Sequence, residues 1–414
     1  MDISFYHSIK KELIQNILPF WEKYACDTES GGFFGSIDNN NNQNKNESRY
    51  IVMISRLLWT YSAAARLFNE PEYLDTAEYA FSGMMHQFFD KDYGGFFWSV
   101  YSDGTPCIPE KEIYGEAVAI HALSEYAAAL TEIKKQTLQP YAVMDKALAI
   151  FSLLEKYARD PENGGYIEAL TADWKKTTDF KLSEKDIDCN KSMNTNLHVL
   201  EAYTNLYRNL AVVYPDQNDT RILIGRSLID LVRIFTTKIL QKNGHVGIYF
   251  NNDWTRIDNE ISYGHDIEVS WLLWETANEI GDEQLMVEVR PFSIRMATIA
   301  YEEGFDKENG GFEDTLINGK QNKTRIWWNQ AEALIGFFNA WELTGNDNFK
   351  EAFQSVWKWI KEYQIDKKNG EWFWSVNENG KPDLAQPKGG NWKTAYHNAR
   401  CCMEILRRTG NTKI

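Results

Sequence analysis

The amino-acid sequence predicts an all-α protein, an (α/α)6 barrel of six helical hairpins with short β-hairpins at the Gly-Gly turns. The first observation behind this fold class is a turn motif that recurs along the chain. Its six copies lie at residues 29–34, 92–98, 162–166, 242–246, 308–312 and 368–374. The second observation is helical periodicity between the copies. Because the repeat runs through the whole chain, we expect residues 1–414 to form a single catalytic domain.

Each turn motif combines polar or acidic residues, one or two glycines, and then aromatic or β-branched residues. Asp92-Tyr93-Gly94-Gly95-Phe96 is a strong copy, and Lys242-Asn243-Gly244-His245-Val246 is a weaker one. Glycine permits the positive φ that such turns need, and the residues after it suit a short strand. The motif therefore predicts a short β-hairpin in each repeat.

The segments between the turns carry apolar residues at i, i+3, i+4 and i+7, as in residues 55–67, 116–126 and 329–338. Successive motif glycines are 60 to 80 residues apart, which leaves room for two helices of ~12–16 residues and their connections. Open solenoids usually have shorter repeats, of about 20–47 residues. We therefore expect a closed ring rather than an open array or two unrelated helical domains, with the Asn-rich residues 39–46 as a solvated loop.

The charge and the cysteine content exclude several classes of function. The chain has 59 acidic and 44 basic side chains and a formal net charge of −15, which disfavours nucleic acid and anionic membranes as partners. Its five cysteines are odd in number and never spaced CxxC, so neither a disulfide framework nor a zinc site is predicted. The sequence shows no nucleotide-binding motif, signal-peptide pattern or long apolar run, and we predict a cytoplasmic enzyme.

Three of the seven histidines lie among other residues suited to chemistry, and His265 is the first of them. His265 follows Gly264, where a helix is expected to begin, and Glu268 shares its face of the helix at i,i+3. Glu268 is expected to orient the imidazole, while the helix N-terminus favours the neutral ring that a general base needs. The alternative is a His–Glu pair that only caps the helix.

His397 and His198 are the other two candidates. His397 follows a Gly-rich turn and begins a helix near the end of the chain, which a closed ring brings beside the first hairpin. Asn194 and His198 share a helix face at i,i+4, and Glu201 lies one turn beyond His198. A packed core residue is the alternative for each histidine. The remaining histidines are expected to be surface or core residues: His7, His86, His121 and His245.

Aromatic residues make up 14% of the chain, including 15 tryptophans, and some of them flank the candidate histidines. The tandem Trp327-Trp328 precedes Glu332, and Trp392 lies in the turn before the last helix. Arg56 lies inside an apolar run, where burial is costly unless the guanidinium has a partner or a ligand. Aromatic faces with a few placed polar groups are typical of a carbohydrate pocket, although ordinary helix packing is the alternative for the Trp pair.

Several motifs spread over almost the whole chain resemble the N-acylglucosamine 2-epimerase superfamily, and within it most closely the branch of cellobiose 2-epimerases. The motifs are Ser55-Arg56-Leu57-Leu58-Trp59, Lys191-Ser192-Met193-Asn194, Tyr263-Gly264-His265-Asp266-Ile267-Glu268, Trp327-Trp328-Asn329-Gln330-Ala331-Glu332, and Trp392-Lys393 with Tyr396-His397-Asn398. Tyr263 before Gly-His favours the disaccharide branch. One departure is Thr394-Ala395, where the family often has Cys-Pro.

The resemblance implies an (α/α)6 barrel that reversibly inverts C2 of a reducing-end glucose without a metal or redox cofactor. It implies that His265 and His397 are the acid/base residues and that Glu268 tunes His265. It implies further that Arg56 holds the sugar oxygens and that His198 belongs to the catalytic group. The residues implied to bind the substrate are Tyr114, Asn194, Trp327, Trp328, Glu332 and Trp392.

The expected substrate is a β-1,4-linked disaccharide such as cellobiose, lactose or a mannobiose-like sugar, with no nucleic acid or membrane partner. We expect a monomer or a weak homodimer. Alternatives on the same scaffold are an aldose–ketose isomerase or an N-acylglucosamine 2-epimerase. An inverting glycoside hydrolase is a further alternative, although it needs two carboxylates about 6.5–9.5 Å apart, as is a non-catalytic sugar- or protein-binding role.

Overall fold

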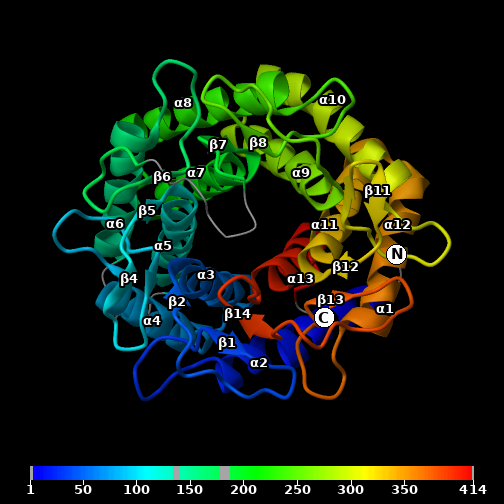
Figure 1. Cartoon of the computed structure of the whole chain (residues 1–414), viewed down its shortest axis with the longest axis horizontal. Helices are drawn as coiled ribbons and strands as arrows, with labels where there is room; N and C mark the ends of the chain where they lie inside the picture. Colours follow the sequence, from blue (N-terminus) through cyan, green and yellow to red (C-terminus); the bar gives the residue numbers. More distant parts are fainter. Residues whose placement is uncertain (1–2, 134–139, 178–186, 413–414) are drawn as a thin grey trace.

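The computed structural model describes residues 3–133, 140–177 and 187–412, and these form a ring of paired helices around a central axis (Figure 1). The inner helices of the described chain are α3 (Ile51–Phe68), α5 (Ile113–Ile133), α7 (Met193–Val213), α9 (Tyr263–Ile280), α11 (Trp327–Thr344) and α13 (Tyr396–Thr409). The outer helices are α1 (Ile3–Glu12), α2 (Leu18–Tyr24), α4 (Tyr73–Gly83), α6 (Pro140–Leu153), α8 (Asn218–Ile234), α10 (Glu283–Ile299) and α12 (Asp347–Trp359). The predicted (α/α)6 barrel is confirmed.

The inner and outer helices differ in how their apolar residues are distributed. In α5, every residue from Ile113 to Leu130 is buried, which is expected for a helix with neighbours on all sides. In α12, the buried residues fall on one face, and charged residues such as Lys350 and Glu351 cover the other. A helix with apolar residues on all faces thus lies in the inner layer, and a helix with apolar residues on one face lies in the outer layer.

The outer helices of the described chain contain five-residue stretches of wider π-helix. These stretches are η1 (Leu13–Ile17), η2 (Met84–Phe88), η3 (Leu154–Ala158), η4 (Phe235–Ile239), η5 (Ala300–Gly304) and η6 (Ile360–Gln364). The stretches η2 to η6 each end an outer helix directly before its turn, whereas η1 lies between α1 and α2. This recurrence in the last five units supports their description as structural repeats.

The predicted Gly turns close short antiparallel bridges in every repeat. The bridges are Cys26↔Phe33, Phe89↔Phe96, Arg159↔Tyr166, Leu240↔Val246, Phe305↔Phe312 and Ile365↔Trp372. The turns need glycine because the backbone there is left-handed, as at Gly95 with a φ of +72°. A Cβ atom at Gly95 would also lie 2.4 Å from Oε1 of Glu116, which accepts a hydrogen bond from the next backbone N–H.

A buried ion pair anchors most of these turns. The pairs are Asp27–Arg49, Asp90–Lys111, Asp160–Lys191, Asp306–Arg325 and Asp366–Lys388. The fourth turn has Gln241 at the corresponding place, and there His245 Nδ1 lies 2.7 Å from Asp266. His245 is buried, in line with one of the two outcomes expected for it, but its ring also has a charged partner that the sequence analysis did not identify, because Asp266 is adjacent only in the fold.

Short antiparallel strand pairs connect each repeat to the next one. The strands are β1 (Ser36–Ile37), β2 (Arg49–Tyr50), β3 (Ser99–Val100), β4 (Pro106–Ile108), β5 (Lys111–Glu112), β6 (Ala169–Leu170), β7 (Lys191–Ser192), β8 (Tyr249–Phe250), β9 (Ile261–Ser262), β10 (Thr315–Ile317), β11 (Lys320–Asn322), β12 (Arg325–Ile326), β13 (Ser375–Val376) and β14 (Gly389–Gly390). The pairs between repeats are β2–β3, β5–β6, β7–β8, β9–β10 and β12–β13, and β14 pairs with β1. That last pair closes the ring.

The seam between the first and last repeats has further bonds. In the register of β1 and β14, Ser36 lies opposite Gly390. The Asn-rich loop contributes here, because Asn41 Nδ2 donates to the backbone oxygen of Asn369 over 2.8 Å and Asn369 Nδ2 donates to that of Asn39 over 2.9 Å. The loop is thus largely solvated, as predicted, but two of its asparagines also bind the last hairpin.

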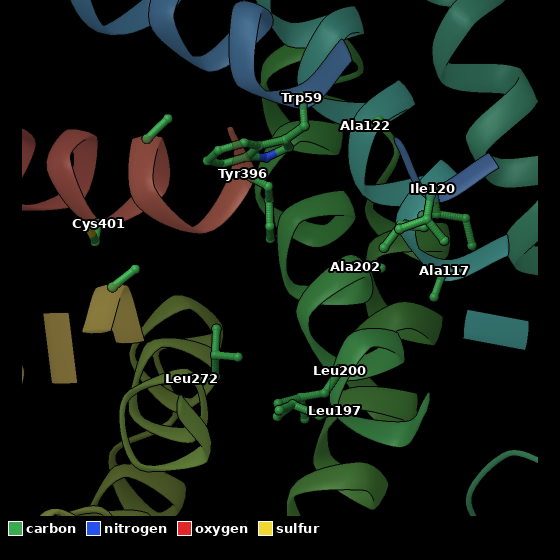
Figure 2. Packing of buried hydrophobic residues seen from close by; sticks show 14 of the residues in the cluster. Trp59, Ala117, Ile120, Ala122, Leu197, Leu200, Ala202, Leu272, Tyr396 and Cys401 are labelled. Atoms are coloured by element: carbon green, nitrogen blue, oxygen red, sulfur yellow. The ribbon is translucent and has the colours of Figure 1, made fainter. Parts of the chain in front are cut away.

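The hydrophobic core fills the space between the inner and outer helices and between neighbouring inner helices. Figure 2 shows Trp59 of α3 beside Tyr396 of α13, with their rings 4.9 Å apart and nearly perpendicular, while Leu197 and Leu200 lie further along on α7. Small residues such as Ala117 and Ala202 let the helices approach closely. All five cysteines are free thiols. Within the described ranges, none of the helices has the length and apolar character needed to cross a bilayer.

Candidate functional site

The inner helices all begin on the same side of the ring, next to the strand pairs (Figure 1). Their first turns surround a pocket of about 180 Å³. The pocket is lined by Arg56, Tyr114, Asn194, His198, His265, Glu268, Trp327, Trp328, Trp392 and His397. Every site residue predicted from the sequence therefore lines this pocket except Glu332, which lies behind His397.

His397 is held between a carboxylate and a guanidinium. Its Nδ1 lies 2.6 Å from Oε1 of Glu332, and its Nε2 lies 3.4 Å from Nη2 of Arg56. Because a guanidinium only donates, Nε2 is the acceptor, and Nδ1 carries the hydrogen that Glu332 accepts. Burial, and then the charge of Arg56, lower the pKa of His397 well below its usual value. His397 thus presents a neutral ring whose Nε2 can take a proton.

His265 has a different partner from the one expected. Its Nδ1 lies 2.8 Å from the hydroxyl oxygen of Ser262, the last residue of β9, and its ring is 4.8 Å from that of Trp328. Ser262 occupies Nδ1, which leaves Nε2 available for chemistry. Burial lowers the pKa of His265 to about 3, which keeps its ring neutral near pH 7.

The expectation that Glu268 orients His265 is therefore wrong. Glu268 Oε1 accepts a hydrogen bond from Nη2 of Arg400 over 3.1 Å. The two side chains leave the first turns of α9 on one face, as the i,i+3 spacing predicted, but the Ser262 hydroxyl is closer to the imidazole and α13 supplies a cation to the carboxylate. Glu268 still lines the pocket.

His198 is the third histidine of the pocket and also has a carboxylate partner. Its Nδ1 lies 2.9 Å from Oε2 of Glu201, the i,i+3 neighbour that the sequence placed one turn away. The edge of its ring meets Tyr114 at 4.8 Å. Glu201 Oε1 in turn accepts a hydrogen bond of 2.5 Å from the Tyr396 hydroxyl.

Arg56 is a buried cation without a carboxylate within salt-bridge distance among the described residues. Its side chain donates to the Tyr114 hydroxyl over 2.8 Å and to the backbone oxygen of Trp392 over 3.2 Å. Both partners are neutral, so the charge of Arg56 remains available at the pocket. A buried and uncompensated guanidinium is costly unless an anion is stabilised there.

The three tryptophans of the pocket differ in exposure. Trp327 is 4% exposed and packs its ring 4.6 Å from that of Trp374. Trp328 and Trp392 are half-buried, and each therefore presents aromatic surface to the pocket. Trp392 also lies 6.2 Å from the ring of Tyr114. Trp328 and Trp392 thus offer aromatic surface at the pocket, whereas Trp327 is mainly packed against Trp374.

Arg400 lies behind the pocket and was not among the residues predicted from the sequence. Ligand atoms of Glu268, Glu332 and His397 lie within 4.8 Å of one another, which is a spacing that suits a metal ion. Nη2 of Arg400 bonds to both carboxylates, at 3.1 Å and 2.6 Å. The guanidinium is thus the positive charge that this cluster surrounds.

The sequence analysis assigned no role in the site to Ser262 or Tyr396. Ser262 directly precedes the Tyr-Gly-His motif, and Tyr396 directly precedes His397, so adjacency to a motif was the available signal. The contact of Tyr396 with Glu201 joins α13 to α7, and a single sequence does not show which helices face one another.

The positions of the site residues along their helices add a common electrostatic effect. His265 is the third residue of α9, and His397 is the second residue of α13. Unpaired backbone N–H groups at a helix N-terminus create positive potential, which disfavours imidazolium and favours an anion in the pocket. The ends of several helices therefore act together with Arg56.

Comparisons with known proteins agree with the resemblance seen in the motifs. Residues 32–401 match the N-acylglucosamine 2-epimerase (GlcNAc 2-epimerase) family. A cellobiose 2-epimerase of Bacteroides fragilis is 38% identical over 408 residues, which cover 98% of this chain and 100% of the relative. A cellobiose 2-epimerase of Dictyoglomus turgidum is 34% identical, over 99% of this chain and 100% of that protein.

The fold is also similar to that of a solved relative. The structure of cellobiose 2-epimerase from Bacillus thermoamylovorans B4167 matches with a TM-score of 0.88 and 34% identity, over 98% of this chain and 99% of that one. The match spans the ring and the strand pairs that carry the pocket. From its sequence and its structure, the chain belongs to the N-acylglucosamine 2-epimerase family.

Proposed function

We propose that the protein reversibly epimerises C2 of the reducing-end glucose of a β-1,4-linked disaccharide, giving the mannose configuration. The observation that carries the proposal is the pairing, in one pocket, of two neutral histidines with a buried guanidinium that lacks a carboxylate partner in the described chain. The full-length similarity to cellobiose 2-epimerases favours a disaccharide as substrate.

The first chemical step is removal of the C2 proton from the open-chain aldehyde. Nε2 of one histidine takes this proton, and the electrons of the C–H bond form a cis-enediolate with negative charge on oxygen. Arg56 stabilises that charge, with help from the Tyr114 hydroxyl and the helix N-termini. This role accounts for a buried guanidinium at the pocket.

The second step returns a proton to the opposite face of C2. After rotation about the C2–C3 bond, the second histidine takes up a proton from water at Nε2 and transfers it to C2, which gives the other epimer, while the first histidine releases to water the proton that it removed. His265 and His397 take these two roles, and the reverse reaction exchanges them. His198 and Asn194 line the same pocket and hold sugar hydroxyls, while Trp328 and Trp392 stack on the rings.

The experiment that tests this function is incubation of the protein with cellobiose in D2O, followed by NMR. We expect glucosyl-mannose with deuterium at C2. A ketose product would instead indicate reprotonation at C1, and hence an aldose–ketose isomerase. Free glucose would indicate hydrolysis, and absence of both product and label would contradict the proposal.

A further inference from the structure

Arg400 connects three carboxylates that belong to three different inner helices. Its Nη1 bonds to Oε1 of Glu201 on α7 and to the Tyr396 hydroxyl, the latter over 2.9 Å. Its Nη2 lies 3.1 Å from Glu268 on α9 and 2.6 Å from Glu332 on α11. The guanidinium is 3% exposed, so these contacts take place away from bulk water.

Two of these carboxylates hold a histidine of the pocket by its Nδ1 atom. Glu332 accepts from His397, and Glu201 accepts from His198. Glu332 also accepts a hydrogen bond from the indole nitrogen of Trp271 over 2.9 Å. A change in the charge of either carboxylate therefore changes the protonation of a histidine ring that lines the pocket.

The protonation state of the Glu332–His397 pair decides whether His397 can act as a base. With one proton in the pair, Nδ1 carries it, Glu332 is ionised, and Nε2 has a free lone pair. With a second proton, Nε2 is protonated whether the pair is an imidazolium with a carboxylate or an imidazole with a carboxylic acid. In both cases His397 has lost its basic nitrogen.

Burial favours that second proton. Desolvation raises the pKa of both Glu268 and Glu332, and the charge of Arg56 acts against this rise. A positive charge in contact with both carboxylates acts in the opposite direction. Arg400 makes that contact. Its Cζ atom lies 4.9 Å from the centroid of the Trp271 ring and 4.6 Å from that of the Tyr396 ring, and this packing holds the guanidinium in place.

The charged and titratable groups around this guanidinium come from all the inner helices of the described chain. They are Arg56 on α3, Tyr114 and His121 on α5, His198 and Glu201 on α7, Glu268 on α9, Glu332 on α11, and Tyr396, His397, Cys401 and Glu404 on α13. Of the cations among them in the described residues, Arg400 alone contacts all three carboxylates, whereas Arg56 faces the sugar.

We propose that Arg400 is a positioning residue whose charge keeps Glu201, Glu268 and Glu332 ionised and thereby keeps His397 and His198 in the tautomer that presents Nε2 to the sugar. This proposal rests on the proposed function for its role in turnover. The tautomers themselves are a property of the protein that can be measured without substrate.

The structure also offers a way to replace the side chain with a soluble cation. Arg400 lines a second cavity, of about 330 Å³, which opens toward the other end of the barrel beside Trp59, His121 and Arg407. Truncation of Arg400 to alanine enlarges that cavity next to the three carboxylates. Guanidinium ion can then enter from the rear without passing through the sugar pocket.

The test compares R400A with and without added guanidinium, and uses urea as a neutral molecule of the same shape. We expect R400A to epimerise cellobiose at least tenfold more slowly than wild type at pH 7, with the acid limb of kcat/KM moved upward by at least one pH unit. Millimolar guanidinium should raise the rate of R400A at least fivefold, and urea should not raise it. Equal effects of guanidinium and urea, or an unmoved acid limb, would overturn the proposal.

Two further variants separate charge from folding. R400K keeps a positive charge, and we expect its acid limb to lie between those of wild type and R400A. R407M removes a guanidinium that is 55% exposed on the same helix and pairs only with Glu404 among the described residues, and it should behave as wild type. A loss of activity in R407M equal to that in R400A would show a general effect of charge on α13 and contradict the proposal.

Imidazole ¹⁵N NMR of the substrate-free protein gives a readout that does not depend on the reaction. We expect Nδ1–H tautomers for His397 and His198 in wild type, and a shift toward Nε2-protonated rings in R400A that guanidinium reverses. If wild type does not epimerise cellobiose but shows these tautomers, the proposed function fails while the role of Arg400 stands. Unchanged tautomers in R400A would refute that role.

Discussion

The Nδ1 atom of His265 lies 2.8 Å from the hydroxyl of Ser262, a neutral partner three residues earlier in the chain. His397, its counterpart in the proposed reaction, has a carboxylate in the same place. The two histidines are therefore oriented by groups of different charge. A carboxylate stabilises imidazolium, whereas a hydroxyl mainly fixes the orientation of the ring.

The first prediction concerns Ser262. S262A removes a hydrogen bond worth about 1 kcal/mol, so we expect kcat for epimerisation to fall about fivefold with little change in KM, and S262T to restore most of it. Steady-state kinetics on cellobiose measure this. S270A is a matched control, since Ser270 lies on α9 with His265 but donates to the backbone oxygen of Ile267. An S262A variant as active as S270A would remove Ser262 from the mechanism.

The second prediction separates the two bases by their partial reactions. H265A and H397A should each epimerise at least ~100-fold more slowly, because general acid–base groups contribute about that factor or more. Each variant keeps one base, so each should still exchange the C2 proton of one epimer with D2O. We expect the two variants to exchange opposite epimers, as followed by NMR on cellobiose and on glucosyl-mannose. Exchange of both epimers by one variant would be incompatible with a base on each face.

The third prediction is the pH dependence of the wild-type enzyme. Burial lowers the pKa of His265 to about 3 and that of His397 well below its usual range. A general base loses activity as pH falls through its pKa, so kcat/KM should stay level from pH 8 to below pH 6. An ordinary exposed histidine would lose half of its basic form near pH 6.5. A midpoint of the acid limb at pH 6.5 would contradict the neutral rings inferred above.

The fourth prediction concerns the buried ion pairs of the turns. Lys111 Nζ lies 2.7 Å from Asp90, and the lysine side chain is fully buried. K111M leaves the buried carboxylate without its cation and should lower the free energy of unfolding by about 3 kcal/mol. The control is K45M, whose pair with Glu29 is 60% and 75% exposed, and we expect no measurable change in its free energy of unfolding. Urea denaturation compares the two, and equal effects would show that the turn does not depend on its ion pair.

The fifth prediction concerns the glycine turns. Gly165 has a φ of +72°, and a Cβ atom there would lie 2.4 Å from the ring of Trp254. G165A should cost the left-handed strain of about 1 kcal/mol plus about 2 kcal/mol for the clash. Gly281 has a φ of +73° with nothing within 4 Å, so G281A should cost the strain alone. Thermal unfolding that ranks the two variants equally would show that Trp254 moves aside freely.

The ring could be predicted because its signal is repeated. Each turn places glycine before an aromatic or β-branched residue, and six copies at similar spacing, such as Gly94 and Gly164, confirm one another. The π-helical stretches could not be predicted in the same way. Residues such as Leu13 and Ile17 are both buried and continue an ordinary amphipathic pattern, so the sequence carries no signal for the wider winding.

The pocket was predictable where chemistry-bearing residues share a short motif. His265, His397 and Trp392 stood out for that reason, and all three line the pocket. The contacts that tune them were not predictable, because Arg400 and Glu268 lie on different helices and 132 positions apart in the chain. Spacing within one helix suggested Glu268 as the partner of His265, and only the closed ring, in which Arg400 of α13 reaches Glu268 of α9, shows which cation the carboxylate contacts.

Because β1 pairs with β14, the first and last repeats are joined in the same way as any other two neighbouring repeats. Lys10 at the beginning donates to the backbone oxygen of Thr412 at the end over 2.8 Å, and the interface of the first and last hairpins uses the same strand pairing as the interfaces between other neighbours. A circular permutant opened at another interhelical turn would thus keep every contact around the pocket. The order of the six units along the chain could therefore be changed without changing the ring that they form.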